Sequence, residues 1–281
     1  MRTLIIGTGL IGGSFALALR RCGLSDEIWG VESSPQNADE ALRLGLVDRI
    51  VTLDEGFPEA DLTVLAVPVD AAPLLAVKLL NKVRDNQTIM DTGSIKGELC
   101  EVISQHPSRG RFVATHPMWG TEYSGPSAAR KDAFTGRTVV VLERERSDAD
   151  ALERVENIYK AFGMNLISMN DGEEHDLHAA YVSHISHITS FALALTVLEK
   201  EREEQHIFDL AGGGFESTVR LAKSSAATWV PIFLRNKYNV LDVLREHIHQ
   251  LQVIRKMLES DDAAGLEETI LRANGIRRII Q

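Results

Sequence analysis

Two polar segments of the chain carry side chains that could take a proton from an alcohol. His116 stands in the segment THPMWGTE and Ser94 in the segment DTGSIKG. A neutral imidazole can accept a hydroxyl proton while a hydride leaves the same carbon, and a serine hydroxyl can hold either the imidazole or the substrate hydroxyl. We therefore predict that His116 is a general base and that Ser94 assists it. A turn histidine and a helix N-cap serine are the alternatives.

The second half of the chain adds a candidate site for an anion. Arg220 follows the glycines at 212–214, and a guanidinium after such a loop could clamp a carboxylate through two parallel hydrogen bonds. His187 lies on the same predicted helix face as Asp176 and could point toward a cleft. A salt bridge of Arg220 and a satisfied core position of His187 are the alternatives. Trp229 by itself indicates core packing, and only its neighbourhood favours a substrate wall.

The histidine-rich segment is not predicted to bind a metal ion. On a continuous helix His175 and His178 share one face, whereas His184 and His187 point to roughly the opposite side. Four imidazoles so arranged cannot converge on one ion, and the chain has no H-E-x-x-H pattern. We therefore predict that the protein uses no metal.

A glycine pattern at the N-terminus predicts the element that would bring an oxidant to these groups. Gly7, Gly9 and Gly12 form a G-x-G-x-x-G sequence between the apolar residues 3–6 and a helical pattern over 15–21. In this pattern the first glycine permits a tight turn, the second lets a pyrophosphate approach the backbone, and the third lets the helix pack against the strand. The segment is thus predicted to bind a dinucleotide at a helix N-terminus.

Glu32 is predicted to select between the two nicotinamide dinucleotides. It follows the apolar segment 27–31 and stands twenty residues after Gly12. A carboxylate at this position accepts hydrogen bonds from the ribose hydroxyls and repels a 2′-phosphate, so we predict NAD as the cofactor. A solvated charge at a strand end is the alternative. The predicted cofactor-binding residues are Gly7, Gly9, Leu10, Ile11, Gly12, Glu32, Val67 and Pro68.

Apolar runs alternate with helical patterns through the first half of the chain. The alternation predicts an α/β, doubly wound parallel sheet with its ligand at the carboxyl ends of the strands. Beyond residues 170–172 only long helical periods remain. We predict a Rossmann-type NAD-binding domain over residues 1–170 and an all-α dimerisation and substrate domain over 171–281. The predicted strands are 3–6, 27–31, 62–67, 88–90, 112–114, 138–142 and the short piece 165–169.

Composition argues against several other classes of function. The 281 residues carry a formal net charge of −10 with no Lys/Arg-rich run, which argues against nucleic-acid binding. No signal peptide precedes the first strand, and Cys22 and Cys100 have no paired spacing, so we expect a cytoplasmic protein. The apolar stretch 179–198 is long enough to span a membrane, but histidine, serine and threonine interrupt it. We predict instead that this stretch is a helix through which two copies of the chain form a homodimer.

Five motifs together resemble the prephenate and arogenate dehydrogenase family of tyrosine biosynthesis. In chain order they are GTGLIGGS, DTGSIKG, THPMWGTE, an HD pair followed by SHxxH, and GGGF followed by R and W. The resemblance covers most of the chain. It implies a Rossmann domain and a helical dimerisation domain, with the active site in the cleft between them.

The resemblance also implies a role for individual residues. His116 matches the catalytic histidine of the family, and Ser94 matches the serine that hydrogen-bonds this histidine and the substrate hydroxyl. Ser186 and Trp119 depart from the family, which often has proline and a small residue at these positions. The resemblance therefore does not predict the shape of the cleft. The matches expected near the substrate are Arg220, which would bind a carboxylate, His187, Trp229, and the polar pair Thr121 and Glu122.

The implied reaction is the NAD-dependent oxidative decarboxylation of prephenate to 4-hydroxyphenylpyruvate. His116 would take the proton of the C4 hydroxyl while a hydride passes to NAD and the ring loses CO2 and becomes aromatic. Arogenate, which has an amino-acid side chain in place of the pyruvyl group, is the alternative substrate. A β-hydroxyacid dehydrogenase would normally need a lysine where this chain has histidines, and a non-catalytic dinucleotide sensor would not need Ser94 and His116.

Overall fold

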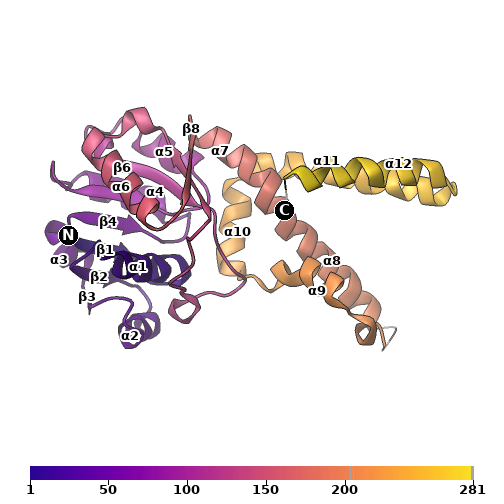
Figure 1. The fold of residues 1–281 in the computed structure, drawn as a ribbon, viewed down its shortest axis with the longest axis horizontal. Coiled ribbons are helices and arrows are strands. Elements are labelled where there is room, and N and C mark those ends of the chain that lie inside the picture. Colours follow the sequence, from indigo (N-terminus) through magenta and orange to yellow (C-terminus); the bar gives the residue numbers. More distant parts are fainter. Residues whose placement is uncertain (203, 205, 280–281) are drawn as a thin grey trace. The chain divides into compact units, whose positions relative to one another are not determined.

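The computed structural model describes residues 1–202, 204 and 206–279 (Figure 1). The chain divides into two compact units. The first unit is Met1–Asn236 and the second is Lys237–Gln281. The predicted domain boundary after residue 170 lies inside the first unit, at the start of a helix. All of the predicted catalytic, substrate and cofactor residues therefore belong to the first unit.

The first unit contains an eight-stranded sheet with the order β3-β2-β1-β4-β5-β6-β7-β8. Every predicted strand is present, and the two-residue β3 was missed because it is too short for a periodic pattern. The predicted doubly wound sheet is confirmed with one antiparallel pairing, between β6 and β7. No α-helix lies between these two strands, and a parallel return would need such a crossover. The strands are β1 (Arg2–Ile6), β2 (Glu27–Val31), β3 (Arg49–Ile50), β4 (Leu62–Leu65), β5 (Thr88–Asp91), β6 (Phe112–Pro117), β7 (Thr138–Leu142) and β8 (Asn165–Met169).

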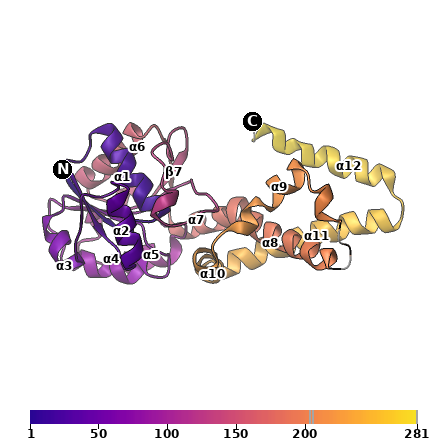
Figure 2. The same cartoon turned by 90° about the horizontal axis from the view of Figure 1, so that it is seen from below.

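Helices cover both faces of the sheet (Figure 2). Successive strand side chains point to opposite faces. Accordingly, Ile5 packs into the cluster that contains Phe15 of α1, whereas Leu4 packs with Leu79 of α4. The chain reverses its strand order between β1 and β4, and this switch point is where an open α/β sheet offers a crevice to a ligand. The helices are α1 (Leu10–Cys22), α2 (Pro35–Arg43), α3 (Leu53–Gly56), α4 (Ala72–Leu80), α5 (Gly97–Ile103) and α6 (Ala149–Ala161).

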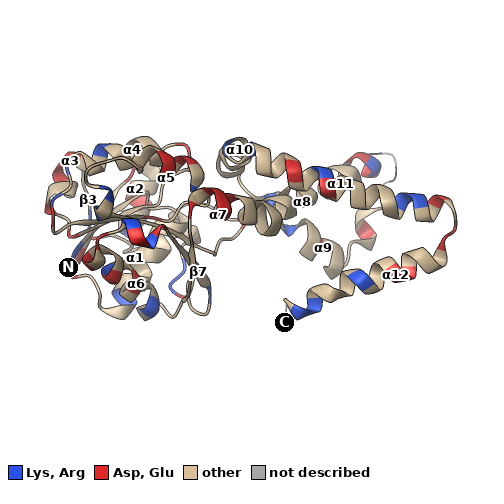
Figure 3. Cartoon of the chain, turned by 90° about the horizontal axis from the view of Figure 1, so that it is seen from above, with Lys and Arg blue, Asp and Glu red and all other residues tan. Residues whose placement is uncertain are grey.

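One helix of thirty residues, Gly172–Glu201, follows β8. Asp171 caps its first segment α7, and Glu173 and Glu174 place negative charge in the first turn, where the helix dipole favours it (Figure 3). A π-helical turn at Ala180–His184 separates α7 (Gly172–Ala179) from α8 (Ile185–Glu201). By length and mean hydropathy, 1.3, this helix could cross a membrane, and 17% of its most apolar window is buried in the structure.

The remaining segments of the described chain are also helical. In the first unit α9 (Gly213–Val219) passes into a 3-10 turn at Arg220–Lys223 and is followed by α10 (Ala226–Arg235). Only Gly212 of the glycine run stands outside the helix, as its N-cap. The second unit consists of α11 (Lys237–Glu259), α12 (Ala263–Ala273) and a 3-10 segment at Asn274–Arg278.

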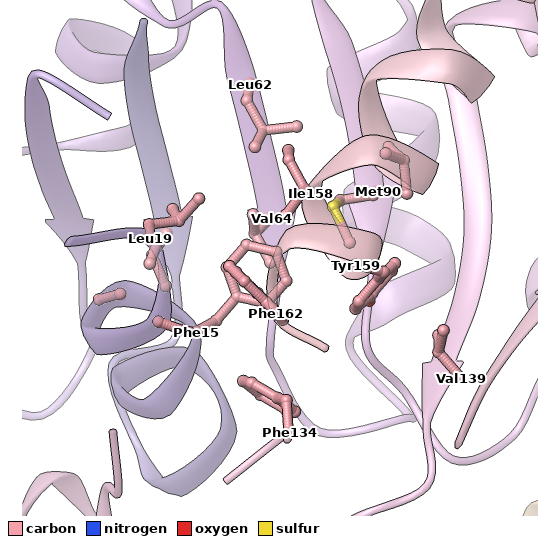
Figure 4. Packing of buried hydrophobic residues seen from close by; sticks show 14 of the residues in the cluster. Phe15, Leu19, Leu62, Val64, Met90, Phe134, Val139, Ile158, Tyr159 and Phe162 are labelled. Atoms are coloured by element: carbon pink, nitrogen blue, oxygen red, sulfur yellow. The ribbon is translucent and has the colours of Figure 1, made fainter. Parts of the chain in front are cut away.

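An aromatic cluster joins α1 and α6 over one face of the sheet (Figure 4). The Phe15 ring lies edge-on to Tyr159 and Phe162, with ring centroids 5.9 and 5.0 Å apart. Pairs of this geometry contribute roughly 0.5–1.5 kcal/mol each beyond their buried area. Because Phe15 follows the glycine run in α1, this packing fixes the helix whose N-terminus faces the crevice.

Candidate active site

The backbone of the glycine run is shaped for a ligand. Gly7 has φ +91°, and a Cβ at Gly12 would lie 1.9 Å from the carbonyl oxygen of Gly7, so a side chain would clash there. A Cβ at Gly9 would meet no atom within 4 Å. Two of the glycines are thus required by the protein's own packing, whereas the third leaves open space at the helix N-terminus. A pyrophosphate fits this arrangement.

Glu32 lies against the glycine run, and its carboxylate accepts hydrogen bonds from Thr8, Ser33 and Ser34. One carboxylate oxygen accepts hydrogen bonds from the amide and the hydroxyl of Thr8, both at 3.0 Å, and the other accepts from the amides of Ser33 and Ser34 at 2.9 and 3.1 Å. Partial burial raises the pKa of Glu32, but these hydrogen bonds outweigh it and hold the pKa below its ordinary value. The group is therefore a fixed carboxylate at the end of β2. The predicted neighbours Leu10 and Ile11 begin α1, and Val67 and Pro68 lie in the segment after β4, beyond Ala66.

His116 lies within β6 rather than after it, paired with Val140 of β7. The side chain is 8% exposed, and its Nδ1 is 2.8 Å from Nε2 of His175. Burial lowers the pKa of His116 well below its ordinary value, and the neighbouring His175, Lys96 and His184 lower it further. The imidazole is therefore neutral near pH 7, as a proton acceptor must be.

A buried ionic cluster that the sequence did not reveal lies beside the histidine. The Lys96 ammonium pairs with the Asp91 carboxylate, and both side chains are almost fully buried. The backbone amide of Thr115, the residue before His116, donates to Asp91 at 3.0 Å. The amides of Lys96 and Gly97 donate to the two carboxylate oxygens of Asp176, each at 2.8 Å. The only sign of this cluster in the sequence is the presence of Asp91 and Lys96 in the segment DTGSIKG, around the turn that ends a strand.

Ser94 lies half-buried in the loop between β5 and α5. Among the described residues no hydrogen bond joins it to His116, whose Nδ1 is instead bonded to His175. A contact of Ser94 with the imidazole or with a substrate hydroxyl stays a prediction. Ser94 stands two residues before Lys96. The loop that carries both residues binds the Asp176 carboxylate through backbone amides.

Arg220 is paired with Glu122 across 2.8 Å. It begins the 3-10 turn after α9, so a short helix separates it from the glycines at 212–214. Its side chain is 48% exposed and that of Glu122 is 12% exposed, so the guanidinium is accessible to an anion. An open pocket of about 790 Å³ is lined by Glu122, Tyr123, Ser124, Ser127, Ala128, Ala129, Arg130, Lys223 and Ser225.

His187 and Trp229 form a stacked pair with ring centroids 3.4 Å apart. Because Ser183 supplies a carbonyl oxygen, Nδ1 of His187 must donate the 3.1 Å hydrogen bond between them. Burial lowers the pKa of His187, with a smaller contribution from Arg220 in the same direction and an opposing one from the Ser183 hydrogen bond. The neutral ring therefore keeps Nε2 as an acceptor.

The two departures from the family pattern, Trp119 and Ser186, have local packing and hydrogen-bond partners of their own. Trp119 is partly buried and packs edge-on against Phe134 of the core cluster, with ring centroids 5.9 Å apart. Ser186 is exposed and its hydroxyl donates to the carbonyl of Val182 at 3.5 Å. Thr121 accepts a hydrogen bond from the amide of Tyr123.

Within the described part of the chain, no group of three or more His, Cys, Asp or Glu is placed to hold a metal ion.

A dinucleotide crevice and a buried, neutral histidine on one sheet define a nicotinamide-dependent dehydrogenase as the class of protein. Family models narrow this class. The model described as "Prephenate dehydrogenase, nucleotide-binding domain" matches residues 15–168, and "Prephenate dehydrogenase, dimerization domain" matches residues 171–272. The chain belongs to the prephenate dehydrogenase family, and the resemblance of its motifs is confirmed.

Individual relatives agree with the family models. The chain is 33% identical to prephenate dehydrogenase of Bacillus subtilis (strain 168), over 94% of this chain and 71% of the relative. It is 29% identical to cyclohexadienyl dehydrogenase of Zymomonas mobilis, over 94% of this chain and 90% of the relative. The crystal structure of prephenate dehydrogenase from A. aeolicus, in complex with hydroxyphenyl propionate and NAD+, superposes with a TM-score of 0.89 at 30% identity, over 100% of this chain and 98% of that one.

Proposed function

We propose that this protein catalyses the NAD-dependent oxidative decarboxylation of prephenate, with His116 as the general base. The observation that carries the proposal is the buried imidazole of His116, which is neutral and hydrogen-bonded at Nδ1, so that Nε2 is the nitrogen left to meet a substrate. The A. aeolicus relative, which is described with NAD+ and a hydroxyphenyl ligand, supports the same cofactor and an aromatic product.

NAD fits the crevice at the carboxyl ends of β1, β2 and β4. The open space at Gly9 and the N-terminus of α1 would receive the pyrophosphate, and Glu32 would accept hydrogen bonds from the ribose hydroxyls. The fixed negative charge of Glu32 would oppose a 2′-phosphate. When bound, NAD+ supplies the acceptor for the hydride that leaves the substrate ring.

The protein's own part in the chemistry is the movement of one proton. Nε2 of His116 takes the proton of the C4 hydroxyl as the C4–H bond gives up its hydride and C4 becomes a carbonyl carbon. The bond to the ring carboxylate then breaks, its electrons enter the ring, and CO2 leaves. The aromatic phenolate oxygen can take the proton back from His116. Aromaticity supplies the driving force.

The substrate carries two carboxylates, and the chain offers cationic and polar groups for them. Arg220 can exchange its ion pair with Glu122 for a bidentate pair with a substrate carboxylate. The stacked His187 and Trp229, together with Thr121, would form the wall of the substrate site. Ser94 would hold the reacting hydroxyl.

A direct assay tests the proposed reaction. Purified protein is mixed with prephenate or arogenate and with NAD or NADP, and formation of the reduced nucleotide is followed by absorbance. We expect NADH to form with prephenate. Turnover of arogenate alone would replace prephenate as the substrate, and a lack of turnover with both would overturn the proposed function. Preference for NADP would contradict the role of Glu32.

The same proposal includes a homodimer formed through residues 179–198. α8 exposes Leu195 and Leu198, 61% and 50% of whose surfaces are accessible, and the dimerisation-domain model spans this segment. Light scattering should give about twice the chain mass of 31.0 kDa. Leu195→Glu should shift the protein toward monomer, whereas Leu74→Glu on α4 should not, although Leu74 is 79% exposed. A monomeric wild type would refute the dimer.

The acidic net charge and the polar residues of α8 support a cytoplasmic enzyme without a membrane or nucleic-acid partner.

A further inference from the structure

A chain of three buried side chains runs from helix α7 to the base. Nδ1 of His175 is 2.8 Å from an Asp176 carboxylate oxygen, and Nε2 of His175 is 2.8 Å from Nδ1 of His116. The three residues are 5%, 2% and 8% exposed, in the order Asp176, His175, His116. We propose that His175 and Asp176 are positioning residues that hold His116 in the tautomer whose Nε2 is unprotonated. The proposal rests on the proposed role of His116 as the base.

The hydrogen-bond pattern permits one arrangement of protons when both imidazoles are neutral. Asp176 serves two backbone amides and His175 as an acceptor, so Nδ1 of His175 must carry the proton between them. A neutral His175 then has a bare Nε2, which can only accept. His116 must donate to it from Nδ1, and its own Nε2 is left bare. The carboxylate thereby sets the tautomer of a base two hydrogen bonds away.

Asp176 is held in place by groups from three parts of the fold. The amides of Lys96 and Gly97 bind its carboxylate, and the side-chain amide of Asn236 donates to its backbone carbonyl at 2.7 Å. The start of α7 also packs closely on the same loop. A Cβ at Gly172 would lie 2.7–2.8 Å from backbone atoms of Lys96 and Gly97. The orientation of the carboxylate, and with it that of His175, is therefore determined by backbone packing.

The same chain also gives a hydrogen-bond partner to the protonated state of His116 that the reaction produces, and this offsets part of the cost that burial and the neighbouring His175 impose on that state. Once Nε2 has taken the substrate proton, the Nδ1–H of the imidazolium is a stronger donor to His175, and the negative charge of Asp176 lies at the far end of the chain. No proton needs to leave Nδ1 for this stabilisation. His116 comes from β6, whereas His175 and Asp176 come from α7. The general base of the sheet domain is therefore positioned by residues of the helix that follows it.

Two variants of His175 with amide side chains of different length separate positioning from simple packing. In His175→Gln the side-chain carbonyl can occupy the place of Nε2 and still accept from His116, whereas in His175→Asn the amide reaches only toward Asp176. We expect kcat to fall on the order of 10²-fold in His175→Asn, because a misplaced tautomer can cost up to about 10⁴-fold. His175→Gln should keep kcat within about fivefold of wild type, and KM and NAD binding should hardly change in either variant. His178→Gln, an exposed position one turn along α7, is the matched control.

A second measurement reads the tautomer without turnover. In protein carrying ¹⁵N-labelled histidine, near neutral pH, Nδ1 of His116 should give the signal of a protonated nitrogen and Nε2 that of an unprotonated one. The two signals should move toward each other in His175→Asn and remain apart in His175→Gln. Equal kcat in both variants, or the opposite tautomer in wild type, would overturn the proposal. If His116→Asn is fully active, the proposed base itself fails, whichever result the His175 variants give.

Discussion

His116→Asn is expected to lower kcat on the order of 10²–10⁴-fold, which is the usual contribution of a positioned general base. Asparagine is smaller than histidine and keeps a polar group in the buried space, but it cannot take up a proton near neutral pH. The loss should therefore appear in the chemical step. Steady-state assays with saturating prephenate and NAD measure it.

Cofactor binding should separate this effect from a loss of structure. His116 belongs to β6, whereas the groups that fit NAD lie at the ends of β1, β2 and β4, so calorimetry should give a nearly unchanged dissociation constant for NAD. His106→Asn changes a partly exposed histidine of the same domain, outside the proposed site, and should behave as wild type. Wild-type turnover in His116→Asn would remove this residue from the mechanism.

The fold of the nucleotide-binding part could be predicted because its demands are local. Gly7 needs a positive φ and Gly12 needs room beside a carbonyl, and both requirements restrict the residue type at a fixed spacing. Buried parallel strands likewise appear as short apolar runs. The strand β7 was predicted but its antiparallel direction was not. That direction depends on the absence of a crossover helix between β6 and β7, and not on the residues of the strand itself.

The site could be predicted only in part because its partners are distant in the sequence. His116 and Glu32 follow or end strands, so the sheet topology alone places them. The bond between His116 and His175 joins residues 59 apart, and that between Lys96 and Asp176 joins residues 80 apart. No spacing rule connects such positions.

The long helix after β8 shows a second limit of sequence periodicity. Asp176 and His187 share one face only if the helix between them is an uninterrupted α-helix. The π-helical turn at Ala180–His184 lies between them and changes the number of residues per turn, so that this condition fails. His187 stacks on Trp229 instead, while Asp176 binds the loop before α5.

Lys96→Met should lower the free energy of unfolding by about 3–5 kcal/mol, the usual effect of removing one partner from a buried ion pair. Lys96 has no exposed surface and Asp91 is 1% exposed, so the remaining carboxylate cannot be solvated without disrupting the packing around the end of β5. The amides of Gly93 and Thr115 still donate to Asp91 but carry no full charge. Urea unfolding followed by tryptophan fluorescence, at one protein concentration, measures the loss.

Two further variants decide whether the loss comes from the unpaired charge. Lys82→Met removes a cation of the same type from an exposed pair with Asp54, where solvent screens the charges, and should leave the urea midpoint unchanged. Adding Asp91→Asn to Lys96→Met removes the uncompensated carboxylate and should restore part of the stability. If the double variant is no more stable than Lys96→Met, the loss comes from the missing packing of the lysine stem. Recovery of stability in the double variant would show that the uncompensated charge of Asp91 causes the loss. The stability of the loop that binds Asp176 would then depend on the balanced charges of Lys96 and Asp91.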